Sequence, residues 1–217
     1  MAKPTPVKTP LGDLMWVVFN GEGKENLSGK LKYTADIVLD NDSEECKTLT
    51  KLIDDFWKDN KPSGFKGKAK TKGYRPEMRK VLDENGQETY DEDDVVIKEP
   101  TGRTVFTFTT DTTYPSGDPK VIKIYNAKGN PVNLGDKKIG NGSRGQISGA
   151  MGIYNRDDGK GVSLYLNAIR ITKLEEFTQE EQWDDVDDSE GGWTGEDNWD
   201  AEDAPQDSKP EGGTPRL

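Results

Sequence analysis

The sequence predicts a mainly β fold: a small, partly open barrel of five or six strands with one helix. Short runs of alternating apolar and polar residues recur along the chain, separated by glycine- and proline-rich turns. A single segment has apolar residues at helical spacing, and it lies between the early and late strands. A β-sandwich is the alternative arrangement of the same strands.

The first sixty residues predict two strands and the helix. Residues 1–12 carry three prolines and are expected to form a loose lead-in. Residues 14–19 form an apolar run typical of a buried strand, and residues 31–39 alternate as a half-buried strand does. Ser43 is a good N-cap, and the helix that follows should pack on the barrel through Phe56 and Trp57.

The middle of the chain, residues 61–100, predicts an irregular insertion that leaves the core. Residues 61–80 contain eight basic side chains and one acidic one, whereas residues 81–99 contain eight acidic side chains and one basic one. Neither part has the regular apolar spacing of a helix or strand. The carboxylates at 91–94 lack the spacing of a calcium loop, so we expect no metal site there but a charge run that faces the basic segment or water.

The later strands are predicted at residues 103–110, 121–125, 146–154 and 162–174. The apolar phase of the last strand slips, which indicates a β-bulge near Asn167 or Ala168. Core positions are expected where aromatic residues share a strand face with aliphatic residues or with each other, as do Tyr33, Phe106 and Phe108.

Charge divides the chain into a domain at 1–177 and an acidic tail at 178–217. The tail has 14 acidic and 2 basic side chains, a net charge of −12, so the first 177 residues carry +1 of the total of −11. Low apolar content and high net charge predict that the tail is disordered. The acidic balance of the whole chain therefore does not argue against a polyanionic ligand of the domain.

Several classes of function are excluded by residue content. The chain has no histidine and one cysteine, Cys46, so histidine acid–base chemistry, Cys/His zinc sites and intrachain disulfides are ruled out. The glycine-rich bend at 139–145 lacks the lysine and spacing of a phosphate-binding loop. No apolar run is long enough to cross a membrane. We expect a soluble cytoplasmic protein that needs no cofactor and is not an enzyme.

Two places combine cations with aromatic rings, which binding of unpaired nucleic acid requires. The first is the basic part of the insertion, whose alternative interpretation is a solvated loop; its candidates are Phe65, Lys66, Lys68, Lys70, Lys72, Tyr74 and Arg75. The second is the outward face of the late strands, where tyrosines could instead pack on neighbouring side chains. Its candidates are Lys123, Tyr125, Arg144, Tyr154, Arg156 and Tyr165. Trp16 is out of phase with Met15 and Val17 and could also be exposed and binding.

The order of these elements resembles the single-stranded-DNA-binding proteins of tailed-phage replication. The match is close over the bend Lys138-Ile139-Gly140-Asn141-Gly142-Ser143-Arg144-Gly145, the hairpin at 146–166 and the ending Ile169-Arg170-Ile171-Thr172-Lys173-Leu174-Glu175-Glu176-Phe177. The resemblance implies an OB-fold-like barrel and sequence-independent binding of single-stranded DNA in phage DNA replication and recombination, in the cytoplasm of the infected bacterium. Monomers or weak homodimers are expected.

The acidic tail contains tryptophans, which a tail that served only solubility would not need. We expect the tail to compete with DNA for the binding groove and, once displaced, to dock on replication partners. The resemblance implies that these are a polymerase and a helicase–primase. The docking residues expected are Trp183, Trp193, Trp199 and Leu217, the last in place of the aromatic residue that often ends such tails. A protein-interaction adaptor and an RNA-binding chaperone on the same fold are the alternative functions.

Overall fold

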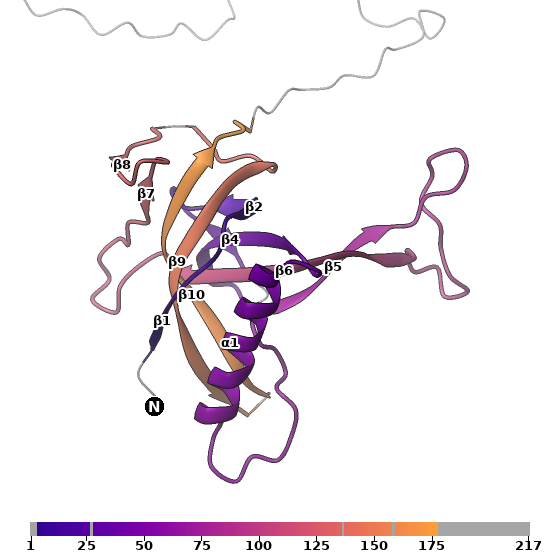
Figure 1. The fold of residues 1–217 in the computed structure, drawn as a ribbon, viewed down its shortest axis with the longest axis horizontal. Coiled ribbons are helices and arrows are strands. Elements are labelled where there is room, and N and C mark those ends of the chain that lie inside the picture. Colours follow the sequence, from indigo (N-terminus) through magenta and orange to yellow (C-terminus); the bar gives the residue numbers. More distant parts are fainter. Residues whose placement is uncertain (1–3, 27, 136, 158, 178–217) are drawn as a thin grey trace, which may run out of the picture. The chain divides into compact units, whose positions relative to one another are not determined.

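The computed structural model of the chain describes residues 4–26, 28–135, 137–157 and 159–177. The predicted tail, including its tryptophans and Leu217, lies outside the described residues. The described part is mainly β, with one helix, as the sequence predicts (Figure 1). Its elements are β1 (Thr5–Lys8), β2 (Gly12–Val18), β3 (Lys24–Glu25), β4 (Leu31–Asp40), α1 (Glu44–Asn60), β5 (Tyr74–Lys80), β6 (Lys98–Asp111), β7 (Lys123–Tyr125), β8 (Pro131–Val132), β9 (Ser143–Arg156) and β10 (Gly159–Lys173).

Five strands pair in a ring, in the order β2, β4, β6, β10, β9 and back to β2. Strands β9 and β10 form a long antiparallel hairpin, and β4 pairs antiparallel with both β2 and β6. The ring is an irregular barrel because β6 and β10, which run parallel, pair only at Leu164 with Phe108 and Tyr165 with Thr109. This arrangement is consistent with an OB-like fold.

The gap beside that short pairing is filled by the loop before β5. Val162 donates its backbone N–H to the carbonyl of Thr71 at 3.0 Å, and Thr107 donates to the carbonyl of Gly73 at 2.9 Å. Gly73 has a φ of 78°, and a Cβ there would lie 2.6 Å from the Leu164 side chain. Glycine is therefore required for this segment to close the barrel.

The helix forms and packs as its sequence predicts. Ser43 caps it, because the Ser43 Oγ accepts a hydrogen bond from the backbone N–H of Cys46 at 3.1 Å. The buried face of α1 contacts β4, β9 and β10, and it consists of Cys46, Leu49, Ile53, Phe56 and Trp57. The predicted core residues Tyr33, Phe106 and Phe108 are buried. The predicted bulge is confirmed too, since the β9–β10 register shifts between Leu166 and Ala168.

The prediction of a loose lead-in at residues 1–12 is wrong for β1, which pairs with the outer edge of β9. The proline content misled the prediction. An edge strand needs hydrogen bonds on one side only, so Pro6 is tolerated there, while Val7 is buried in the core.

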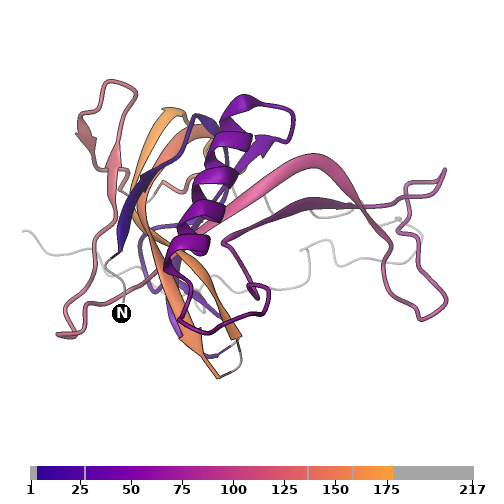
Figure 2. The same ribbon diagram turned by 60° about the horizontal axis from the view of Figure 1, so that its bottom comes forward.

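The predicted insertion leaves the barrel, but part of it is a regular hairpin rather than irregular chain. Strands β5 and β6 continue past the barrel as an arm, residues 77–103, that projects from the ring in both views (Figures 1 and 2). Sequence periodicity did not show these strands because the arm has no buried face; Met78, for example, is exposed on it.

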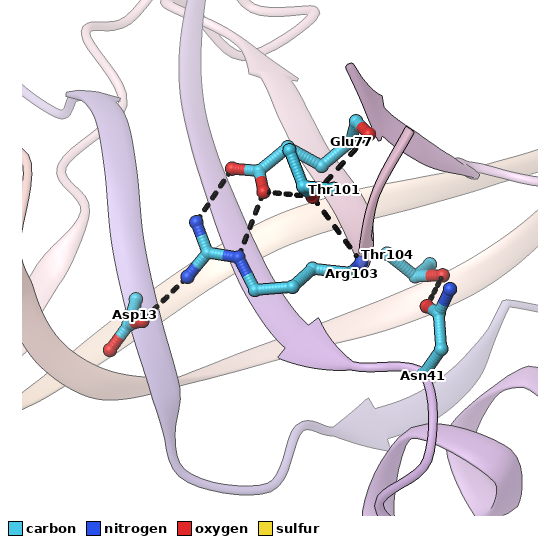
Figure 3. Close-up of polar contacts among 6 residues, drawn as sticks. All are labelled: Asp13, Asn41, Glu77, Thr101, Arg103 and Thr104. Carbon is cyan, nitrogen blue, oxygen red and sulfur yellow. Dashed lines mark hydrogen bonds and ion pairs between the residues drawn. The ribbon is translucent and has the colours of Figure 1, made fainter. Parts of the chain in front are cut away.

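A charged cluster fixes the foot of the arm to the barrel (Figure 3). Arg103 on β6 donates two hydrogen bonds to Glu77 on β5, from Nε and Nη2, each at 2.8 Å. Its Nη1 lies 3.1 Å from Asp13 of β2, and Thr101 donates its hydroxyl to Glu77 at 2.6 Å. The bidentate contact orients the guanidinium, so the arm is held at a defined angle to β2.

Candidate nucleic-acid interface

Trp16 is displayed on the surface by a bulge in β2. The β2–β4 register shifts between Met15 and Val18, and Trp16 takes a φ of 51°, a left-handed conformation. Its backbone N–H donates to the Asn141 Oδ1 at 2.8 Å, and its side chain is 60% exposed. A bulky residue in this conformation costs about 1–3 kcal/mol, and such strain concentrates at functional sites.

The Trp16 ring stands at a groove of about 500 Å³ over the outward faces of β4 and β6. Strand alternation puts small polar side chains on the floor, because Thr34 lies opposite Thr109 and Asp36 opposite Thr107. The groove is lined by Trp16, Lys24, Glu25, Asn26, Lys32, Thr34, Asp36, Arg75, Thr107 and Thr109.

Two cations of this groove are paired with carboxylates. Arg75 lies over Asp36, a carboxylate only 5% exposed; its Nη2 is 3.4 Å from the Asp36 Oδ2, and its Nη1 donates to Thr107 at 2.8 Å. Lys32 pairs with Asp111 and, by donating to it, holds the pKa of Asp111 below its ordinary value. A phosphate in the groove would compete with these carboxylates for Arg75 and Lys32.

Tyr165 continues the interface from β6 onto β10. It lies next to Thr109 in the parallel pairing and next to Ala150 in the antiparallel one, so it shares the outward face with the groove. Its ring lies over Gly152, where a Cβ would come within 2.6 Å of it, and the side chain is 38% exposed. Tyr154 is similarly placed over Gly161, at 2.7 Å.

Tyr125 and Lys123 also face outward, on β7 beside the far part of β10. A second groove of about 360 Å³ lies there, lined by Lys8, Tyr125, Gly129, Gln146, Ser148, Ala168, Ile169 and Arg170. Arg170 donates to the carbonyl of Ala127, and its buried Nε has no hydrogen-bond partner within the described residues. The outward face of β9, β10 and β7 therefore displays three tyrosines, as alternation predicts.

The aromatic residues of the basic insertion point into the protein rather than out of it. Tyr74 packs on Phe106, and its hydroxyl donates to Asp54 at 2.8 Å; burial raises the pKa of this tyrosine. Lys72 donates to the same carboxylate, which raises the pKa of Lys72. Phe65 packs edge-on against Trp57 of the helix. These three side chains join the segment to α1.

The other lysines of the insertion lie on its exposed side. Lys66 and Lys68 are exposed, and the Lys70 backbone donates to the carbonyl of Lys160 at 2.8 Å. The two predicted arginines are not brought together, because Arg144 is near the start of β9 and Arg156 is its last residue. Arg144 lies 3.7 Å from Asp13.

Sequence reasoning missed the floor of the main groove. The alternation of residues 31–39 identified the buried face of that strand, so the opposite phase, Lys32, Thr34 and Asp36, could have been assigned to the outward face. Nothing in the sequence pairs β4 with Arg75, which lies on the arm side of the barrel. The structure thus joins Trp16 and Arg75, predicted separately, in one site.

No group of three or more histidine, cysteine, aspartate or glutamate side chains in the described residues could hold a metal ion. No helix of the described residues is long and apolar enough to cross a membrane.

The fold is similar to a class of solved structures, the single-stranded-DNA-binding proteins of bacteriophages. The gp2.5 protein of bacteriophage T7 is 16% identical, with a TM-score of 0.51 over 82% of this chain and 92% of that one. The C-terminally truncated protein of bacteriophage Enc34 is 12% identical, with a TM-score of 0.52 over 79% and 88%. The same Enc34 protein in complex with single-stranded DNA has a TM-score of 0.50 at 12% identity, over 80% and 89%.

These likenesses confirm the predicted resemblance at the level of the fold. No protein-family model matches the chain, and no curated protein does.

Proposed function

We propose that this chain binds single-stranded DNA without reading its sequence, in phage DNA replication and recombination in the cytoplasm of the infected bacterium. The observation that carries the proposal is Trp16, a mostly exposed ring held in strained backbone at a groove between charged side chains. Every base has a flat face, so stacking on such a ring is tolerant of sequence. The Enc34 neighbour is described in complex with single-stranded DNA, which supports the same ligand here.

The geometry supports a path for the strand. Bases stack first on Trp16, cross the β6–β10 pairing at Thr109, and continue over Tyr165 and Tyr154. Lys24, at the rim of the groove, and Lys66 and Lys68 on the loop meet phosphates. Arg156 follows Tyr154 at the end of this path. Tyr125 and Lys123 lie in the opposite direction along β10 from Tyr165, where they offer a second branch. We do not assign stacking to Phe65 or Tyr74, whose rings pack inside.

The end of the described domain supports a proposed competition of the tail with DNA. Gly140 donates its N–H to the Glu175 carbonyl at 2.8 Å, and the Phe177 N–H donates to the Lys138 carbonyl at 3.2 Å. The same bend contains Asn141, which accepts the backbone N–H of Trp16. The last described residues therefore lie at the bend that holds Trp16. We propose that the tail competes there with DNA and, when displaced, docks on a polymerase and a helicase–primase through its tryptophans and Leu217.

The test is fluorescence anisotropy of a labelled oligo-dT titrated with the full chain at several salt concentrations. We expect tight binding whose log–log salt slope reports several phosphate contacts, at about 0.7 per contact. Mixed-sequence oligonucleotides should bind equally well and duplex DNA weakly. Failure to bind oligo-dT would favour a protein-interaction adaptor, and tighter binding of the matching ribo-oligomer would favour an RNA chaperone.

Deleting residues 178–217 tests the competition by the tail. We expect the deleted protein to bind oligo-dT about tenfold or more tightly at low salt, with the gain shrinking as salt screens the tail. Unchanged affinity at low salt would contradict the competition.

A further inference from the structure

The arm ends in a two-pronged tip, residues 81–97, which we call the fork (Figures 1 and 2). One prong is closed by the bridge between Leu82 and Glu88, and the other by the bridge between Tyr90 and Val96. Backbone hydrogen bonds from Thr89 to Val81 and from Ile97 to Thr89 join the prongs at their base. The fork is thus an ordered shape of its own, not a loose loop.

The fork has apolar side chains but no core. None of its residues is buried, and four apolar side chains are between 40% and 58% exposed: Leu82, Tyr90, Val95 and Ile97. Isolated hairpins are at best marginally stable in water, so a contact that covered these apolar side chains would stabilise the fork. We therefore expect the fork to gain a contact elsewhere.

The charge of the fork defines the chemistry of its partner. It contains seven acidic side chains and no basic one. Two of the acids, Asp83 and Asp91, accept backbone N–H groups within their own prongs, whereas Glu84, Glu92 and Asp93 are exposed. A matching surface must therefore be basic.

This chain carries such a surface in the loop at 61–73, which has five lysines and no acidic residue; Lys66 and Lys68 are exposed, whereas Lys72 pairs with Asp54. In both views the fork projects away from that loop (Figures 1 and 2). The cluster at Arg103 fixes the foot of the arm (Figure 3), and from Arg103 to Lys98 strand β6 extends for about 16 Å at roughly 3.3 Å per residue. Because the fork points away from the loop of its own chain, it can instead contact this loop on another copy.

The edge of the arm is a poorer contact than its tip. Strand β5 contains Pro76, which cannot donate a hydrogen bond, and charged residues at Arg79 and Lys80. These features oppose pairing of β5 with a strand of another molecule.

We propose that the fork of one copy binds the basic loop of a second copy, through carboxylate–lysine pairs around the exposed apolar side chains. Because donor and acceptor surfaces differ, the contact can continue head to tail from copy to copy. It needs no nucleic acid, so its test is independent of the proposed function.

The experiment is sedimentation equilibrium of the full chain at low ionic strength, without DNA. A fork variant carries Glu84→Lys, Glu92→Lys and Asp93→Lys, and a loop variant carries Lys66→Glu and Lys68→Glu. We expect the wild-type protein to self-associate in a salt-sensitive way. Each variant alone should self-associate at least about tenfold more weakly, because its fork and its loop then carry charges of the same sign. An equimolar mixture of the variants should associate again, because the basic fork faces an acidic loop.

A control variant carries Glu22→Lys, Asp42→Lys and Asp118→Lys. It makes the charge change of the fork variant at exposed sites away from the fork and the basic loop, and it should associate like the wild type. Circular dichroism checks that each variant is folded. The proposal is overturned if the wild type is monomeric under these conditions, if the fork variant associates like the control, or if the mixture of fork and loop variants stays dissociated.

Discussion

The Asn141 side chain accepts a hydrogen bond from the backbone N–H of Trp16 across the molecule, at 2.8 Å. This contact joins the bend that precedes β9 to the bulge of β2, two segments far apart in the sequence. It lies in line with the antiparallel β2–β9 pairing, two residues beyond the last pair, Leu14 with Ser143. The glycine-rich bend thus helps to hold the tryptophan in its left-handed conformation.

Asn141→Ala should therefore weaken DNA binding without removing any group of the proposed path. A hydrogen bond of this kind is worth about 0.5–1.5 kcal/mol, so we expect an affinity loss of roughly 2- to 12-fold for oligo-dT. The measurement is anisotropy with a labelled oligonucleotide. Asn133→Ala, which removes a similar amide cap from a turn outside the groove, should have no effect. Equal affinities of the Asn141→Ala and wild-type proteins would argue against this positioning role.

Tyr165 should contribute by stacking, so Tyr165→Phe should bind like the wild type and Tyr165→Ala more weakly by about 1–3 kcal/mol. Gly152→Ala should mimic part of this loss, because the added Cβ would displace the ring that lies over it. The salt slope should not change in either variant, since neither removes a cation. A loss in Tyr165→Phe as large as in Tyr165→Ala would point to the hydroxyl instead.

Asp36→Asn should tighten DNA binding. The neutral amide no longer holds Arg75 by its charge, so this guanidinium becomes available to a phosphate, and a carboxylate is removed from the groove floor. We expect a several-fold gain at low salt and a salt slope steeper by about 0.7. The double variant Asp36→Asn/Arg75→Ala should lose the gain; if it keeps it, the cation that is released is not Arg75.

The charged cluster at the foot of the arm should make the free energy of unfolding depend on pH. Hydrogen bonds from Arg103 hold the pKa of Glu77 below its ordinary value of 4.5. The pair therefore stabilises the folded state fully above pH 4.5, and the contribution is lost as the pH falls through the lowered pKa. Glu77→Gln should lower the free energy of unfolding by about 1 kcal/mol at neutral pH, a modest value because Arg103 is a third exposed.

Urea denaturation of the full chain at neutral pH and at progressively lower pH measures this dependence. The difference between wild type and Glu77→Gln should shrink in acid. A difference that is the same at all pH values would contradict the assignment to this carboxylate.

The barrel could be predicted because its strands bury one face, and burial of one face leaves an alternating pattern. Tyr33, Phe106 and Phe108 belong to that alternating pattern, and the buried residues of the capped helix follow helical spacing instead. The arm could not be predicted in this way, because β5 and the fork bury nothing and are ordered by backbone hydrogen bonds. The edge strand β1 was also missed, because the prolines around it indicated a loop, although an edge strand tolerates Pro6.

The candidate site was predicted in part. Alternation alone placed Tyr125, Tyr154 and Tyr165 outward, and phase indicated that Trp16 could be exposed. The rings of Phe65 and Tyr74 could not be assigned to the inside from sequence, because their partners Trp57 and Phe106 lie in separate elements. Tertiary packing, not local pattern, decides where such rings point.

The most direct test of the central claim, that Trp16 and its groove bind single-stranded DNA, is the affinity of Trp16→Ala for a labelled oligo-dT. Tyr114→Ala, which removes an exposed aromatic ring outside both grooves, is the matched control. We predict that Trp16→Ala stays folded by circular dichroism and binds about 5- to 150-fold more weakly, the effect of losing one stacked base, while Tyr114→Ala binds like the wild type. Wild-type affinity in the folded Trp16→Ala protein would contradict the claim.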